Sequence, residues 1–174
     1  MKEGGLLKKD TTADEVLKIG EKCNKCGKCC MHGSGFVLDS EVSKIAAFLN
    51  MPKEKFAKEF IEESEIFHTT VFKFKSLKEE GKPYGPCSFQ KKSLCSIQEV
   101  KPLHCRIGNC GEHGDDLHVW FMLNYLLNVH DPESVRQYDS YIKTGGKILP
   151  GAELSRLFKD KVVLDSILSY DRIR

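Results

Sequence analysis

Four cysteines stand within eight residues near the start of the chain, in the stretch CNKCGKCC at residues 23–30. Four more follow after 56 residues without cysteine. The two sets are Cys23, Cys26, Cys29 and Cys30, and Cys87, Cys95, Cys105 and Cys110. Cysteine thiolates are the shared ligands of zinc and of iron–sulfur clusters, and four of them complete either kind of centre. The cysteines are therefore expected to hold metal, in numbers sufficient for two centres.

The spacing leaves the metal open between an iron–sulfur cluster and zinc. Ferredoxin-type clusters use a C-x2-C-x2-C triplet like that of the first set, and Gly27 frees the backbone for the turn it needs. Zinc sites more often take one close pair from each of two distant segments. This comparison favours iron–sulfur, with a four-iron cluster as one form. The second set argues against a familiar ferredoxin, because its gaps of seven, nine and four residues match no standard motif.

Cys29 and Cys30 are neighbours in the sequence, and this constrains how they could share a metal. Successive side chains diverge, by about 100° in a helix and to opposite faces in a strand. Two adjacent thiolates are therefore not expected to bind one tetrahedral ion, although they could reach two metals or two irons of one cluster. On this basis the segments 23–30 and 87–110 are expected to interleave, with ligands shared between centres.

Other polar side chains near the cysteines could support the metal. His32, His104 and His113 are candidate substitute ligands, but with so many thiols a surface or hydrogen-bonding role is the better interpretation for each. Lys101 and Arg106 could donate hydrogen bonds to thiolates or cluster sulfurs, or they could be solvated charges. There is no glycine-rich cofactor loop and no convincing Ser/His/Asp set, so the sequence names no catalytic residue.

The compartment decides how clustered cysteines are interpreted. We expect no signal peptide, and the longest nearly continuous apolar run, residues 119–127, is far shorter than the ~20 residues of a membrane span. We therefore expect a cytoplasmic protein without a membrane segment, where metal binding is favoured over disulfides. Four disulfides would be the interpretation for a secreted chain. The net charge of +2 predicts no strong attraction to nucleic acid.

The elements that position the cysteines are predicted to be mainly helices with a few short strands. A capping-box pattern from Thr12 to Glu15 begins a helix that ends near Gly20. Apolar periodicity predicts a helical hairpin over residues 39–64, which lacks the basic face of a DNA-reading helix-turn-helix. Residues 70–75 alternate between apolar and polar side chains, a pattern typical of a half-exposed strand.

The second half of the chain is predicted to be helical. Residues 117–129 are apolar nearly all round, which indicates a helix buried in the chain's own core or against a protein partner. Shorter amphipathic helices are expected at 133–143, 151–159 and 160–170.

These patterns predict a small metal-stapled domain with a helical C-terminal extension. The metal-binding domain is expected over residues 1–114, with its core at 20–110. The extension is expected over 115–174, packing on that domain or on a partner. We expect loss of metal to destabilise the core, because it has many turns and few long periodic stretches.

The cysteine pattern resembles that of the CxxCxxCC family, also called YkgJ-type, which is described as a zinc- or iron-chelating domain. The resemblance rests on CNKCGKCC, on Pro86-Cys87-Ser88-Phe89, and on Cys95 followed by Pro102-Leu103-His104-Cys105-Arg106. It covers roughly residues 20–110 and implies that these cysteines chelate metal. The family often has Ile-Tyr-Glu before Arg-Pro, where this chain has Ile97-Gln98-Glu99 and Lys101-Pro102. Flagellin lysine methylases resemble the family in carrying the same cysteine cluster.

Three functions fit these observations. The first is a small metalloprotein, with iron–sulfur or zinc, in electron transfer, metal handling or cofactor maturation. The second is a structural zinc-stapled protein-interaction module, whose apolar helix at 117–129 docks a partner. The third is a protein-modifying or redox enzyme related to the flagellin lysine methylases. The carboxylate pairs Glu62-Glu63 and Asp115-Asp116 are interpreted as solvated charges and give the enzyme no support.

Overall fold

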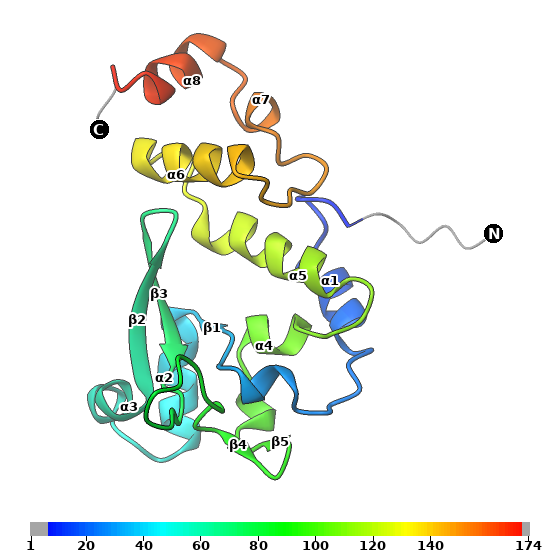
Figure 1. Cartoon of the computed structure of the whole chain (residues 1–174), viewed down its shortest axis with the longest axis vertical. Helices are drawn as coiled ribbons and strands as arrows, with labels where there is room; N and C mark the ends of the chain where they lie inside the picture. The colour runs from blue at the N-terminus through cyan, green and yellow to red at the C-terminus, as the bar shows by residue number, and fades with distance from the viewer. Residues whose placement is uncertain (1–6, 172–174) are drawn as a thin grey trace, which may run out of the picture. The chain divides into compact units, whose positions relative to one another are not determined.

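The fold is mainly helical with a few short strands, as the sequence predicts (Figure 1). The computed structural model describes residues 7–171, and these form two compact units. Unit 1 comprises residues 7–16, 65–70 and 115–171, and unit 2 comprises residues 17–64 and 71–114. The division into domains 1–114 and 115–174 stays a prediction.

Unit 2 carries every cysteine and is built from short elements. In chain order they are η1 (Cys29–Met31), β1 (Phe36–Val37), α2 (Asp39–Phe48), α3 (Lys53–Phe60), β2 (Ile61–Ile66), β3 (Thr69–Phe74), β4 (Gln90–Lys91), β5 (Leu94–Cys95), η2 (Gln98–Val100) and α4 (Leu103–Ile107). The outer ends of β2 and β3 belong to unit 1, and the end of α1 (Ala13–Gly20) belongs to unit 2. Long stretches of the cysteine-bearing chain therefore lie in turns.

An apolar core in unit 2 holds the cysteine segments against the helices. Its buried members are Val37, Val42, Ile45, Ala46, Phe56, Ile61, Phe74, Cys87, Phe89 and Ile97. The predicted apolar face of α2 contributes Val42, Ile45 and Ala46, at the i, i+3, i+4 spacing. Cys30 and Cys95 are partly buried against the same cluster. Both cysteine sets thus share one core.

The predicted helical hairpin over 39–64 is wrong at its C-terminal end. Two helices form, α2 and α3, but the backbone becomes extended at Ile61 and continues as β2. The three-stranded sheet has the order β1-β3-β2, so β2 supplies a hydrogen-bonded neighbour for β3, the strand predicted at 70–75. Because an isolated strand would leave its backbone groups unpaired, pairing within the sheet overrides the local helical pattern.

A short hairpin near the second cysteine set was not predicted. In it β4 pairs antiparallel with β5, which places Gln90 opposite Cys95. The turn residues Lys92 and Ser93 both have positive φ, 48° and 66°, as a two-residue type I′ turn requires. Lys-Ser is not among the usual sequence signals for this turn, so no local pattern indicated the hairpin.

Unit 1 contains most of the second half of the chain. Its elements are α5 (Gly114–Phe121, beginning at the last residue of unit 2), the π-helical turn η3 (Met122–Leu126), α6 (Pro132–Lys143), α7 (Leu154–Leu157) and α8 (Lys161–Leu168). α6 and α8 lie side by side (Figure 1) and bury Val135 with Leu164 and Ile167. The capping box that begins α1 is confirmed, because the Thr12 amide donates to Glu15 Oε2 at 2.9 Å.

The apolar stretch predicted as one helix over 117–129 is α-helical only to Phe121 and then becomes a π-helix. The Leu127 amide donates to the Met122 carbonyl at 2.9 Å, an i to i−5 bond. The Asn124 side chain donates a hydrogen bond from Nδ2 to the Trp120 carbonyl at 2.9 Å. The buried apolar side chains here are Leu117, Val119, Trp120, Phe121, Met122, Leu123 and Leu126. Binding of a protein partner by this stretch stays a prediction.

The residues 7–171 contain no helix that is both long enough and apolar enough to cross a membrane.

Candidate metal centre

The first cysteine set lies in a loop whose turns use positive φ angles. Lys25 has a φ of 50° and Gly27 has a φ of 72°. The Cys30 amide then donates to the Gly27 carbonyl at 3.1 Å, and the chain enters the 3-10 turn η1. Since only glycine adopts such a φ without steric cost, Gly27 is what allows Cys29 and Cys30 to stand on one tight turn.

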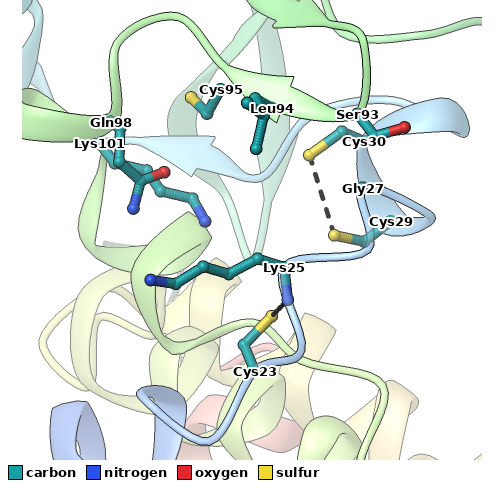
Figure 2. A pocket seen from close by; sticks show the side chains of 10 residues that line it. All are labelled: Cys23, Lys25, Gly27, Cys29, Cys30, Ser93, Leu94, Cys95, Gln98 and Lys101. Atoms are coloured by element: carbon teal, nitrogen blue, oxygen red, sulfur yellow. Dashed lines mark hydrogen bonds between the residues drawn. The ribbon is translucent and has the colours of Figure 1, made fainter.

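The two adjacent cysteines do not diverge as expected. Their Sγ atoms face each other at 3.9 Å, as Figure 2 shows. A tetrahedral centre with metal–sulfur bonds of about 2.3 Å has sulfur–sulfur edges of about 3.8 Å. The expected divergence of the two side chains is therefore wrong, whereas the expectation that Cys29 and Cys30 do not bind one ion stays a prediction, which the sulfur–sulfur distance no longer supports. Successive Cα–Cβ bonds do point apart, but each sulfur is bonded to Cβ, and rotation about the Cα–Cβ bond can turn it back toward its neighbour.

The second cysteine set packs directly against this turn. The Cys87 amide donates to the Cys30 carbonyl at 2.7 Å, and the Gln90 side chain donates from Nε2 to the Gly27 carbonyl at 3.1 Å. A Cβ on Gly27 would lie 2.8 Å from the Ser93 carbonyl oxygen. These contacts hold the two cysteine sets directly against each other. The role of Gln90 could not be read from the sequence, because its partner is 63 residues away.

One pocket, defined here as the thiolate pocket, opens beside the pair. It has a volume of about 280 Å³. Its cysteine lining comes from both sets: Cys23, Cys29, Cys30 and Cys95 (Figure 2). The Cys23 sulfur accepts a hydrogen bond from the Lys25 amide at 3.4 Å. Amide hydrogen bonds of this kind stabilise thiolates and tune the metals that they bind.

Cys26 and Cys110 form a second pair that also joins the two sets. The nearby side chain of Cys26, through its polar contact and its charge, raises the pKa of the Cys110 thiol. Both side chains are exposed. The structure therefore brings together two pairs of cysteines, one within the first set and one across the sets.

Cys87 and Cys105 are the more enclosed thiols. Burial raises the pKa of Cys87, although the amides of Phe89 and Gln90 donate hydrogen bonds to its sulfur. Burial likewise raises the pKa of Cys105 to about 12, against the opposing effects of a hydrogen bond from the Gly35 amide and the charge of Lys101. A Cβ on Gly35 would lie 2.7 Å from the Cys105 sulfur, so Gly35 is needed for this close approach.

The pKa values of Cys29 and Cys30 are shifted in opposite directions. A hydrogen bond from Cys30, with the charge of Lys101 nearby, lowers the pKa of Cys29 to about 6. The same hydrogen bond, with burial and the charge of Cys29, raises the pKa of Cys30. Of the two thiols, Cys29 is the one whose ionisation the surroundings favour. This arrangement favours a cation, because the thiolate is the form of cysteine that binds metal.

No three side chains of His, Cys, Asp or Glu between residues 7 and 171 converge closely enough to hold a metal ion. The donor set still fits zinc or iron in kind, since it consists of soft thiolates with hydrogen bonds from backbone amides. The sulfur–sulfur distance also fits a metal site at the pair Cys29–Cys30. Completing four-fold coordination would require the remaining thiols to approach that pair.

The histidines near the cysteines have other roles in the structure. His104 Nδ1 accepts a hydrogen bond from the Phe36 amide at 2.8 Å, and its ring stacks on Phe36 with centroids 4.9 Å apart. His32 packs edge-on against Tyr84 with ring centroids 5.1 Å apart. These contacts agree with the hydrogen-bonding and surface interpretation of both residues. Ligation by His113 stays a hypothesis.

Glu41 positions the helix that carries Cys105. Its Oε2 accepts the Leu38 amide at 2.9 Å, and its Oε1 accepts the Leu103 amide at 2.7 Å. One carboxylate thus satisfies an amide at the start of α2 and another at the start of α4. Sequence reasoning did not single out this residue, because the second partner lies 62 residues away.

Replacing Glu41 by glutamine is expected to lower the free energy of unfolding by about 1–3 kcal/mol, because one of the two amides would then face an NH₂ group instead of an oxygen. Urea unfolding measures this loss. Glu54→Gln is the matched control, since Glu54 is exposed in the first turn of the neighbouring α3. Equal losses in the two variants would contradict a special role for Glu41.

The comparisons with known proteins agree with this site. No solved structure matches the chain. The sequence model of the CxxCxxCC family, whose description is "Putative zinc- or iron-chelating domain", matches residues 22–119. This match covers more than half of the 174 residues and includes all eight cysteines. The chain belongs to the CxxCxxCC family.

Proposed function

We propose that this protein binds zinc or iron with thiolates from both cysteine sets, and that Cys29 and Cys30 bind the same metal atom. The sulfur–sulfur distance of 3.9 Å carries the proposal, because it is close to the edge of a tetrahedral thiolate site. The hydrogen bond from the Cys87 amide to the Cys30 carbonyl supports participation of the second set. The family's description as zinc- or iron-chelating is consistent with this function.

The pair favours some centres over others. Zinc can take two adjacent thiolates on one ion, and so can one iron of a two-iron cluster. A four-iron cluster places each of its thiolates on a different iron, so they project outward and lie farther apart. The geometry of Cys29 and Cys30 therefore favours zinc or a small iron–sulfur cluster over the four-iron cluster that the triplet spacing suggested.

The exposure of the thiols bears on what the metal does. Cys26, Cys29 and Cys110 are exposed. Structural zinc sites are coordinatively closed and act by holding a fold together. An accessible centre is better suited to exchanging metal or electrons with another molecule. This supports metal handling or electron transfer, with cofactor maturation as a related use, over a purely structural staple.

Anaerobic purification followed by metal and acid-labile sulfide analysis tests the proposal. We expect bound metal at up to two centres per chain, because each centre uses about four of the eight cysteines. Zinc without sulfide would give a colourless protein, whereas iron with sulfide would give visible absorption. Protein that binds neither metal under reducing conditions would refute the proposal.

Cysteine variants test whether the adjacent pair shares a metal. Cys29→Ser and Cys30→Ser are each expected to remove one centre, and the double variant is expected to remove no more than either single variant. Met31→Ser, in the same turn, is the matched control and should keep full metal content. If the double variant loses twice as much metal as each single variant, the two thiolates serve different centres.

A further inference from the structure

A second hollow in unit 2 adjoins the thiolate pocket and is lined mainly by cations. Its volume is about 370 Å³. Lys25, Lys101 and Arg106 line it, and Glu21 is its one acidic lining residue. It shares Cys23, Lys25, Gln98 and Lys101 with the thiolate pocket. We call it the cationic hollow.

The cations of this hollow come from separate segments that the fold brings together. Lys25 lies in the first cysteine loop, Lys101 follows η2, and Arg106 lies on α4. The end of α1 closes the hollow, because Gly20 approaches α4 so closely that a Cβ would lie 2.7 Å from the Arg106 carbonyl oxygen. The arrangement therefore depends on long-range packing within unit 2 and is not a run of charges along the sequence.

These cations are not neutralised by carboxylates. Some surface lysines elsewhere pair with acidic neighbours, as Lys53 does with Asp39 at 3.2 Å. Among residues 7–171, neither Lys25 nor Lys101 nor Arg106 forms an ion pair with a carboxylate. The charge of Lys101 instead acts on the thiols of the site. Lys25 and Arg106 are exposed, and both line the hollow.

We propose that the cationic hollow binds a small oxyanion, a molecule that carries carboxylate or phosphate groups, beside the thiolate centre. Arg106 offers a planar fork of donors that matches either group, and the two lysines add point charges. Gln98 adds a neutral amide donor to the same lining. The volume suits a small molecule, since such sites typically enclose about 300–1,000 Å³.

The ligand would lie next to the metal because Cys23 and Lys25 line both spaces. The oxyanion would therefore be either an anionic substrate of the metal centre or an anionic chelate that delivers the metal ion to the centre or accepts it from there. This assignment of a role rests on the proposed function, whereas binding of the oxyanion does not. The competing explanation is that all three cations only offset the negative charge of the metal-bound thiolates.

Isothermal titration of the full-length protein with inorganic phosphate and with citrate, at constant ionic strength in chloride, distinguishes these explanations. We expect saturable binding of at least one probe, and which probe binds tells phosphate ligands from carboxylate ligands. Arg106→Gln should weaken binding by about tenfold or more, since one charged hydrogen-bonding group is lost. Lys44→Gln, at an exposed position on α2 outside the hollow, is the control and should bind like the parent.

Metal content, measured on the same samples, separates the two proposals. Saturable binding that Arg106→Gln weakens and Lys44→Gln does not supports the oxyanion site, even if the protein holds no metal and the proposed function fails. Absence of saturable binding in metal-loaded protein overturns the oxyanion site and leaves the metal centre standing. Equal weakening in both variants also overturns it, because the binding would then follow net charge and not the hollow.

Discussion

Removal of the bound metal by a chelator is expected to loosen the cysteine segments of unit 2 and to leave the helices of unit 1 intact. Ligand binding stabilises the folded state by about 4 kcal/mol when free metal exceeds its Kd by about 1,000-fold. The loss should be confined to the segments 23–30 and 87–110, because they consist largely of turns and of strands of two residues. The core residues of α2 and α3, which are Val42, Ile45, Ala46 and Phe56, keep the apolar packing among themselves.

Amide hydrogen exchange before and after chelation measures this effect. Protection should fall in the two cysteine segments, because opening there would no longer have to release metal. The helix α6 in unit 1 is the internal control, and its amides should exchange at an unchanged rate. Unchanged protection throughout would show that no metal stabilises the fold. A fall of equal size in α6 would contradict a stabilisation confined to the cysteine segments.

The parts of the fold that the sequence predicted are those determined by neighbours in the chain. The apolar face of α2 and the capping box of Thr12 and Glu15 depend on residues three or four positions apart, and both are confirmed. The strand β3 follows from its own alternation. The strand β2 does not, because its extended conformation depends on pairing with β3. Local patterns carry no information about such a partner.

The candidate site, like the fold, was predicted from the sequence only in part. The number and clustering of the cysteines predicted metal binding, and the family match agrees. The geometry could not be predicted, because the divergence of Cα–Cβ bonds at Cys29 and Cys30 says little about sulfur atoms that rotate beyond them. The contacts of Glu41 and Gln90 join segments more than 60 residues apart. The cationic hollow likewise exists only once α1 meets α4.

Replacing Gly27 by alanine is expected to destabilise unit 2, because the new side chain meets both a backbone and a packing conflict. The positive φ of 72° alone costs a side chain about 1–2 kcal/mol. The new Cβ would also lie 2.8 Å from the Ser93 carbonyl oxygen and 3.0 Å from Gln90 Nε2. Relief of these contacts would separate the two cysteine sets, adding about 1–3 kcal/mol. Metal content should fall as well, because Cys30 and Cys87 are joined beside this contact.

Gly81→Ala is the matched control for this change. Gly81 has a similar φ of 78°, but its Cβ would meet no atom within 4 Å. The control should therefore lose only the backbone term of about 1–2 kcal/mol in urea unfolding, and it should keep its metal. The difference between the two variants measures the close approach of the cysteine sets, independently of glycine's conformational freedom. Equal losses of stability and full metal content in both would mean that the contact at Gly27 does not position the thiolates.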